Sequence, residues 1–399
     1  MTKKRILICD DSLDIGGSFK NKIEQINAIK RTFGEPILAE ELENTIGALE
    51  LRRQRANDND IRDYPEDDAA QVIDNATILI IDYALYDLEA PVTGERIAYL
   101  ARCYSRCGFI VALNQYPPYV EEFFDLTLRG HLESYANLNI PSESLANPGL
   151  WLEPFSGFRP WNWPSLINST DKLERCVAEL KGHLDDTILQ FFGFEGTRSL
   201  TLPRSSLEFL SREKPEEMTF RKFVDSAGSG NGLRGRNENS ICEEAVIRIA
   251  AARIGSWLEH DILPSQNILV DAPHLVSRFP SLLGSKTINI KKLNATASFS
   301  EPSKLGLNPI IEPFRFLRKD WLSRPAWFWN ELRDNENIDE VKNPWETRRL
   351  ERVFCEDICK FEPKDQTREF IADLNSPYSQ RYVKQIQGTN YTPMVRFSL

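Results

Sequence analysis

The fold is decided by one short stretch near the start of the chain, Arg5-Ile6-Leu7-Ile8-Cys9-Asp10-Asp11-Ser12. Its continuous apolar run is typical of a strand that is buried on both faces of a parallel sheet. Two similar runs follow at residues 77–82 and 109–114, and segments with the apolar spacing of helices, such as 19–33 and 93–107, lie between the runs. Strands that alternate with helices predict an α/β fold with a doubly wound parallel sheet at the N-terminus.

Each of the three apolar runs ends in polar side chains. Asp10 and Asp11 follow the first run, Asp82 ends the second, and Asn114 ends the third. Because ligands bind beyond the carboxyl ends of the strands in such sheets, we expect these side chains to meet at one edge. Neighbouring carboxylates repel one another unless raised pKa values or a hard cation such as Mg²⁺ compensate. In the alternative interpretation, the first two acids only cap the following helix and the third starts a turn.

These positions resemble the receiver domain of two-component response regulators, over roughly residues 4–140. The resemblance implies that Asp10, Asp11 and Asp82 hold Mg²⁺ and that Asp82 accepts a phosphoryl group. It also matches Gly94 to the glycine that precedes the next helix. A carboxylate beside Mg²⁺ has the chemistry to attack phosphorus and become an aspartyl phosphate.

Two features depart from that family's pattern within the site region. Asp11 and Asp82 are 71 positions apart, and the excess falls around residues 40–74, which are predicted to form an extended helix followed by a solvated loop. Asn114 stands where the family has Ser or Thr. Its amide is able to donate a hydrogen bond to a phosphoryl oxygen, but it lacks the hydroxyl that moves in the family's switch.

The lysine that the family carries after its fifth strand has no counterpart. We predict the fifth strand at 131–138, and no lysine occurs between Lys30 and Lys172. Arg129 is a candidate substitute. The sequence therefore predicts that the Mg²⁺-binding and phosphoryl-acceptor positions are present. The positions that carry the family's response to phosphorylation are altered.

Composition and charge narrow the class of protein. The net charge is -10, and residues 1–150 carry 25 Asp or Glu against 15 Lys or Arg, so the acidity lies in the N-terminal third. That third would repel phosphates, which makes nucleic-acid binding unfavourable. No apolar run approaches the ~20 residues of a membrane-spanning helix, no signal peptide is visible, and the seven cysteines do not indicate a disulfide framework. We expect a soluble cytoplasmic protein.

Two domains are predicted. Residues 1–147 form the receiver-like domain, and residues 148–399 form a larger, mainly α-helical appended region with a potential split near residue 264. The aromatic and proline-rich stretch 148–164 is interpreted as an ordered bridge. Apolar spacing predicts further helices at 172–192, 240–263 and 365–374.

Three other patterns are weaker candidates for chemistry. Asp271 and His274 form either a catalytic pair or a turn with a hydrogen-bonded histidine. The glycine-rich residues 228–235 lack the ending of a phosphate-binding P-loop, which favours an ordinary loop. Two cysteine pairs have i,i+4 spacing on predicted helices and are either zinc ligands or, as is commoner, buried thiols: Cys103 with Cys107, and Cys355 with Cys359.

Short strings near the C-terminus carry a second resemblance. They are similar to a divergent receiver-bearing family that is associated with prokaryotic conflict systems, and they read Phe354-Cys355-Glu356-Asp357, Ser376-Pro377-Tyr378 and Arg381-Tyr382-Val383. The resemblance implies a signalling component of an antiviral defence module. It also implies a protein partner, an Hsp90-like or histidine-kinase-like ATPase.

The sequence thus predicts a non-enzymatic signalling protein, either a Mg²⁺-dependent phosphoacceptor or a pseudo-receiver. The alternative is a protein-interaction scaffold that is not phosphorylated and whose acidic site is vestigial. In that case the insertion at 40–74 and the aromatic C-terminal region carry the binding. A Mg²⁺-dependent phosphohydrolase is disfavoured, because that class usually has a second Asp two residues after the nucleophile and this chain has Ala84 there.

Overall fold

The computed structural model describes residues 4–57, 68–89, 91–114, 134–153, 155, 157–159, 165–230, 241–284, 290–298, 302–338, 351–371 and 380–388. The chain divides into two compact units, and each unit is assembled from three separate stretches. Unit 1 comprises Met1–Leu152, Ser165–Ile188 and Glu216–Ser256, and unit 2 comprises Glu153–Pro164, Leu189–Pro215 and Trp257–Leu399. Within the described ranges, no helix combines the length and the hydropathy needed to cross a bilayer.

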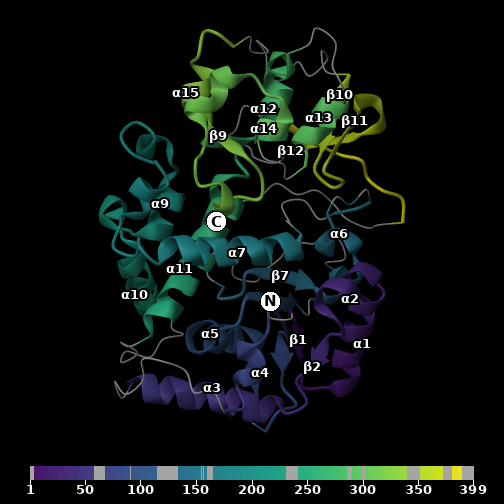
Figure 1. The fold of residues 1–399 in the computed structure, drawn as a ribbon, viewed down its shortest axis with the longest axis vertical. Helices are drawn as coiled ribbons and strands as arrows, with labels where there is room; N and C mark the ends of the chain where they lie inside the picture. The colour runs from purple at the N-terminus through teal and green to yellow at the C-terminus, as the bar shows by residue number, and fades with distance from the viewer. Residues whose placement is uncertain are drawn as a thin grey trace. The chain divides into compact units, whose positions relative to one another are not determined.

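Unit 1 is built around a five-stranded sheet with the order β2-β1-β3-β6-β7, in which all neighbours are parallel (Figure 1). Its strands are β1 (Ile6–Cys9), β2 (Ile37–Leu38), β3 (Ile78–Asp82), β6 (Phe109–Asn114) and β7 (Leu138–Pro141). The side chains of β1 and β3 are all buried, as continuous apolar runs predict. The predicted parallel sheet with helices is confirmed, and the strand order is consistent with a flavodoxin-like α/β fold.

Helices cover both faces of this sheet. In Figure 1, α1 (Leu13–Glu24) and α2 (Asn27–Phe33) lie to one side of the strands, and α3 (Leu42–Asn57) and α5 (Gly94–Tyr104) lie to the other. The short helix α4 (Gln71–Asp74) precedes β3, and a two-stranded hairpin of β4 (Ala84–Leu85) and β5 (Val92–Thr93) connects β3 to α5.

Capping side chains set where the first helices begin. Ser12 Oγ accepts a hydrogen bond from the backbone N–H of Ile15, and Thr93 Oγ1 accepts one from Arg96, so each satisfies an N–H group that has no partner within its helix. Thr93 therefore marks the start of the helix that the apolar spacing over 93–107 predicts. The apolar pattern over 19–33 belongs to two helices rather than one, because α1 ends at Glu24 and α2 begins at Asn27.

The fifth strand differs from its prediction. β7 occupies Leu138–Pro141, so it begins where the predicted strand 131–138 ends. Asn137 explains the shift, because its side-chain Oδ1 accepts a hydrogen bond of 2.8 Å from the backbone N–H of Ile110 and so anchors the chain at the entry to the strand. Arg129 lies outside the described residues, so its candidate role is not addressed by the structure.

Several elements from later in the chain complete unit 1. They are α6 (Pro148–Trp151), α7 (Leu166–Leu180), α10 (Phe220–Gly230) and α11 (Glu243–Trp257). The helix predicted at 172–192 begins earlier, because Ser165 caps α7, and it ends at Leu180, before the separate short helix α8 (Ile188–Phe191). The helix predicted at 240–263 is close to the observed α11 and the π-helix Leu258–Ile262 that continues it. In the stretch 148–164, which is predicted to be an ordered bridge, Trp151 is buried. Residues 160–164 lie outside the residues that the structure describes.

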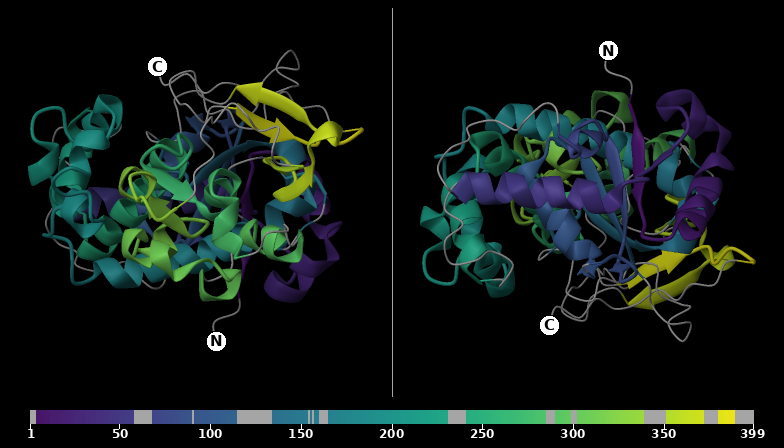
Figure 2. Two further views of the ribbon diagram at one scale, coloured as in Figure 1. Left: turned by 90° about the horizontal axis from the view of Figure 1, so that it is seen from above. Right: turned by 90° about the horizontal axis from the view of Figure 1, so that it is seen from below.

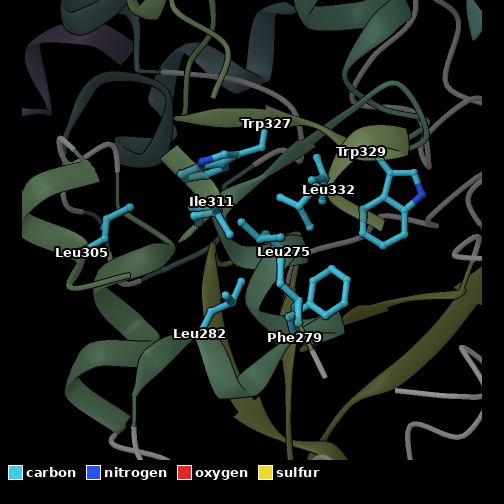
Figure 3. Packing of buried hydrophobic residues seen from close by; sticks show 11 residues of the cluster. Leu275, Phe279, Leu282, Leu305, Ile311, Trp327, Trp329 and Leu332 are labelled. Carbon is cyan, nitrogen blue, oxygen red and sulfur yellow. The ribbon is translucent and has the colours of Figure 1, made fainter. Parts of the chain in front are cut away.

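Unit 2 contains a small aromatic core. The strands β8 (Leu269–Asp271) and β9 (Ala326–Phe328) pair antiparallel, and α12 (Ala272–Arg278) and α15 (Trp329–Arg333) follow them directly. Figure 3 shows Leu275 and Phe279 of α12 packed toward Leu332 and Trp329 of α15. Three further helices belong to this unit: α9 (Arg204–Leu210), α13 (Ile290–Thr296) and α14 (Pro302–Leu305).

A four-stranded sheet, drawn mainly in yellow in Figure 2, forms a second part of unit 2. Its order is β11-β10-β13-β12, formed by β10 (Arg352–Cys355), β11 (Lys360–Pro363), β12 (Arg368–Ile371) and β13 (Gln380–Val383). The helix predicted at 365–374 is wrong, because β12 pairs antiparallel with β13 over four residues there. Pairing with the next strand in the chain overrides the local helical pattern, and sequence spacing alone does not reveal this pairing.

Candidate functional site

The register of the parallel sheet places two acids next to each other. Cys9 of β1 is paired with Ile81 of β3, so the following residues, Asp10 and Asp82, stand side by side at the carboxyl edge. Asp82 is in turn paired with Leu113 of β6, which puts Asn114 one position further along the same edge. The side chain of Asn114 lies outside the described part of the structure, so its predicted contact to a phosphoryl group is not tested.

Asp10 is buried at this edge and has a raised pKa. It is only 7% exposed, its Oδ1 accepts a hydrogen bond of 2.8 Å from the backbone N–H of Ser12, and its buried Oδ2 has no hydrogen-bond partner. Burial raises the pKa of Asp10 to about 6; the Ser12 hydrogen bond opposes this rise, and the negative charges of Asp82 and Asp11 add to it. A buried carboxylate without compensation is costly, so this edge favours a proton or a cation.

Asp82 is held at the end of β3 by its own turn and by the helix that follows. It is 2% exposed, and its Oδ2 accepts a hydrogen bond of 3.1 Å from the backbone N–H of Ala84. Gly94, at the start of α5, packs so closely that a Cβ there would lie 2.3 Å from the backbone oxygen of Asp82. Only glycine permits this approach, which gives a physical reason for a glycine at that position.

Asp11 points toward a different partner from Asp10. Its Oδ2 accepts a hydrogen bond of 2.8 Å from the backbone N–H of Asp87, in the connection between β4 and β5. The edge therefore brings Asp10 and Asp82 together, while one carboxylate oxygen of Asp11 is already bonded to the backbone. The loop residues that make these bonds carry no recognisable motif, and sequence reasoning did not identify them.

The donor chemistry of this edge fits a hard divalent cation. Its side chains offer only oxygen atoms, and one of those atoms, Asp10 Oδ2, is buried without a hydrogen bond. Among the described residues, however, no group of three or more His, Cys, Asp or Glu side chains already stands in an arrangement that holds a metal ion. A cation that binds Asp11 through Oδ2 would compete with the N–H of Asp87 for that oxygen.

The second candidate pair, Asp271 and His274, lies in unit 2. Asp271 caps α12 through the backbone N–H of His274, and its carboxylate lies 2.6 Å from His274 Nδ1. The other ring nitrogen of His274 lies 2.8 Å from Glu356 Oε1, and Arg381 and Arg324 bind the two carboxylates. Both ring nitrogens of His274 thus have hydrogen-bond partners, and the residue lies in α12 rather than in the predicted turn.

The remaining sequence candidates add no site within the residues that the structure describes. Cys103 lies in α5 and Cys107 just after it, whereas Cys355 ends β10 rather than lying on the predicted helix. Cys103, Cys107 and Cys355 are buried, and no metal-holding group that includes them occurs in the described residues. Of the glycine-rich stretch, residues 228–230 end α10 and residues 231–235 fall outside the description. Comparison with protein-family models, curated proteins and solved structures finds no match to this chain.

Proposed function

We propose that unit 1 is a receiver-like signalling module in which Asp82 accepts a phosphoryl group and Asp10, Asp11 and Asp82 bind Mg²⁺. One observation carries the proposal. The register of β1 against β3 sets Asp10 beside Asp82, and Asp10 has a pKa raised to about 6 and a buried oxygen without a partner. A site of this kind gains stability when a divalent cation neutralises its charge.

The chemistry assigned to Asp82 is a single displacement. One carboxylate oxygen of Asp82 attacks the phosphorus of a phosphodonor, an O–P bond forms, and the bond from phosphorus to the leaving group breaks with its electron pair. With acetyl phosphate as donor, the leaving group is acetate. A bound Mg²⁺ supplies charge neutralisation between the acids and the incoming phosphoryl oxygens. Asn114, at the end of the neighbouring strand, is the candidate donor of a hydrogen bond to one of those oxygens.

Intact mass spectrometry tests this function directly. We expect the full chain, incubated with acetyl phosphate and Mg²⁺, to gain the mass of one phosphoryl group, and Asp82→Asn to gain none. Asp14→Asn is the matched control, because Asp14 is an exposed acid in the first turn of α1. The proposal fails if the wild-type protein forms no adduct, or if the Asp82 variant forms the same adduct.

The second resemblance extends the proposal to a cellular role and a partner. We propose that the protein acts in the cytoplasm as part of a bacterial antiviral defence module, with an Hsp90-like or histidine-kinase-like ATPase as partner. The support is the set of short strings near the C-terminus, of which Phe354-Cys355-Glu356-Asp357 and Arg381-Tyr382-Val383 are described by the structure. Transfer of label from radioactive ATP to Asp82 in the presence of such an ATPase would support it.

A scaffold without phosphorylation is the second candidate. Two observations favour it: Asp11 already accepts a hydrogen bond from the backbone of Asp87, and β7 ends in Pro141 where the receiver family has a lysine nearby. In that case Asp82→Ala should leave partner binding and biological output unchanged, and acetyl phosphate should give no adduct. The mass experiment and a pull-down with the Asp82 variant therefore separate the two candidates.

A further inference from the structure

One short segment of unit 1 is tethered to acids from three different elements. We call residues 84–89, which include β4 and the turn after it, the tethered segment. Three of its backbone N–H groups donate to carboxylates: Ala84 to Asp82 Oδ2 at 3.1 Å, Asp87 to Asp11 Oδ2 at 2.8 Å, and Glu89 to Glu43 Oε1 at 2.7 Å. The acids come from the end of β3, the residues after β1, and the first turn of α3.

Two of these bonds join parts of the chain that are far apart in sequence. The bond from Asp87 to Asp11 spans 76 positions, and the bond from Glu89 to Glu43 spans 46. The segment itself offers little apolar surface to hold it in place, since Leu85 is buried but Tyr86 is 58% exposed and Asp87 and Glu89 are exposed. A segment with few buried contacts depends strongly on such bonds for its position.

The acids that hold the segment are also the acids of the proposed cation site. Asp11 and Asp82 each use one carboxylate oxygen on the segment, and both belong to the set proposed to bind Mg²⁺. Asp10 lies beside Asp82 and is more than nine-tenths buried, with an oxygen that has no hydrogen bond, which independently indicates that this edge takes a ligand. A ligand on these oxygens would compete with the backbone N–H groups.

We propose that the tethered segment is the element that responds to the state of the acidic site. When a divalent cation or a phosphoryl group engages Asp11 and Asp82 through the Oδ2 atoms that hold the segment, the N–H groups of Asp87 and Ala84 lose their acceptors and the segment is released. The inference rests on the proposed function of the site. It gives this chain a responding element that does not require a hydroxyl at the position of Asn114.

The coupling works in both directions, because an effect of the cation on the segment requires an equal effect of the segment on the cation. Weakening the tether at its far end should therefore tighten cation binding. Glu43→Ala removes the acceptor of the Glu89 N–H without changing any acid of the site. We expect its affinity for Mg²⁺ to rise by about two- to ten-fold. Glu40→Ala is the matched control, since Glu40 is an exposed acid just before α3 that accepts no bond from the segment in the described structure.

Hydrogen exchange of the full chain, read by mass spectrometry, measures release of the segment. We expect peptides that cover 84–89 to exchange several-fold faster in MgCl₂ or beryllofluoride than without them, while the strands of the sheet do not change. Asp11→Ala should produce the faster exchange without any cation. Calorimetric titration with MgCl₂ on the same samples records whether the cation binds.

The outcomes separate this inference from the function on which it rests. If Mg²⁺ binds but exchange of 84–89 stays unchanged, or if Glu43→Ala binds Mg²⁺ no more tightly than Glu40→Ala, the tethered segment does not respond and only this inference is overturned. If Mg²⁺ does not bind to the wild-type protein at all, the proposed function and the inference fall together. Faster exchange with Mg²⁺, reproduced by Asp11→Ala, supports both.

Discussion

At the residue scale, the carboxyl edge of the sheet in unit 1 contains a buried acid whose ionised form is unfavourable. Asp10 is buried beside Asp82, and its pKa is raised to about 6. A carboxyl whose pKa is higher in the folded state than in the unfolded state contributes stability below its ordinary pKa near 4. That contribution is lost as the pH rises through 6. The folded protein therefore carries an unfavourable charge at neutral pH in the absence of a cation.

The first prediction concerns Asp10→Asn. Because the amide has no charge to bury, we expect the free energy of unfolding at pH 7.5 to rise by about 1–2 kcal/mol, with little change at pH 4. Urea unfolding at the two pH values measures the effect. Asp14→Asn, an exposed control at the start of α1, should show no such difference between the two pH values. An equal change at both pH values would contradict the assigned pKa.

The second prediction concerns the close approach behind Asp82. In Gly94→Ala the new Cβ would meet the backbone oxygen of Asp82 at 2.3 Å and the Cα of Tyr83 at 3.0 Å, and neither atom has room to move aside. We expect a loss of about 2–3 kcal/mol in the free energy of unfolding. Gly47→Ala in α3 is the control, since a Cβ there meets nothing within 4 Å, and it should be neutral or stabilising. Chemical denaturation of both variants decides the point.

At the element scale, sequence patterns predicted the central strands better than the chain's later elements. The runs that became β1, β3 and β6 are buried on both faces, so their composition alone marks them as strands. β7 and β12 carry polar residues, and their bounds depend on pairing with β6 and β13, which local spacing does not reveal. One was therefore predicted too early and the other as a helix. The same limit applies to the tethered segment, because long-range bonds to backbone N–H groups leave no mark in the sequence.

The third prediction concerns the helix that begins the predicted insertion. Arg52 of α3 is 2% exposed and binds Asp68 at 2.6 Å, Asp74 at 2.8 Å and the backbone oxygen of Tyr104 at 3.0 Å. Arg52→Met leaves the buried carboxylate of Asp74 and the partly buried one of Asp68 without their cation, so we expect a loss of about 3–5 kcal/mol in the free energy of unfolding. Arg55→Met, at an exposed position of the same helix, should lower the free energy of unfolding by less than about 1 kcal/mol. Similar losses in the two variants would exclude the network as the cause.

At the scale of the whole molecule, the two units contain buried acids with opposite tendencies. In unit 1 the pKa of Asp10 is raised, whereas in unit 2 the pKa of Glu356 is lowered to about 2. Burial works against the charge of Glu356, but the positive charges of Arg381 and His274 more than compensate. Glu356 therefore contributes stability above its ordinary pKa near 4.5, and this stability is lost as the pH falls toward 2.

The fourth prediction follows for Glu356→Gln. We expect unit 2 to lose on the order of 2–4 kcal/mol at pH 7, because Arg381 is left buried without its carboxylate, and the loss should shrink as the pH falls from 4.5 to 2. Tryptophan fluorescence reports mainly on unit 2, which contains Trp257, Trp321, Trp327 and Trp329 among the described residues. Glu351→Gln, an exposed acid just before β10, is the control and should leave the acid transition in place.

The division of each unit among three stretches of chain has a consequence for biosynthesis. Unit 1 includes Ser165–Ile188 and Glu216–Ser256 as well as its sheet, so a nascent chain that has emerged only as far as Leu152 still lacks α7 and α11. The apolar faces of α7 that include Leu173 and Val177 are then missing from the sheet's surroundings. More than half of the polypeptide must therefore be synthesised before the packing of the N-terminal sheet is complete. During that interval it is a natural client for chaperones that shield unpaired apolar surface.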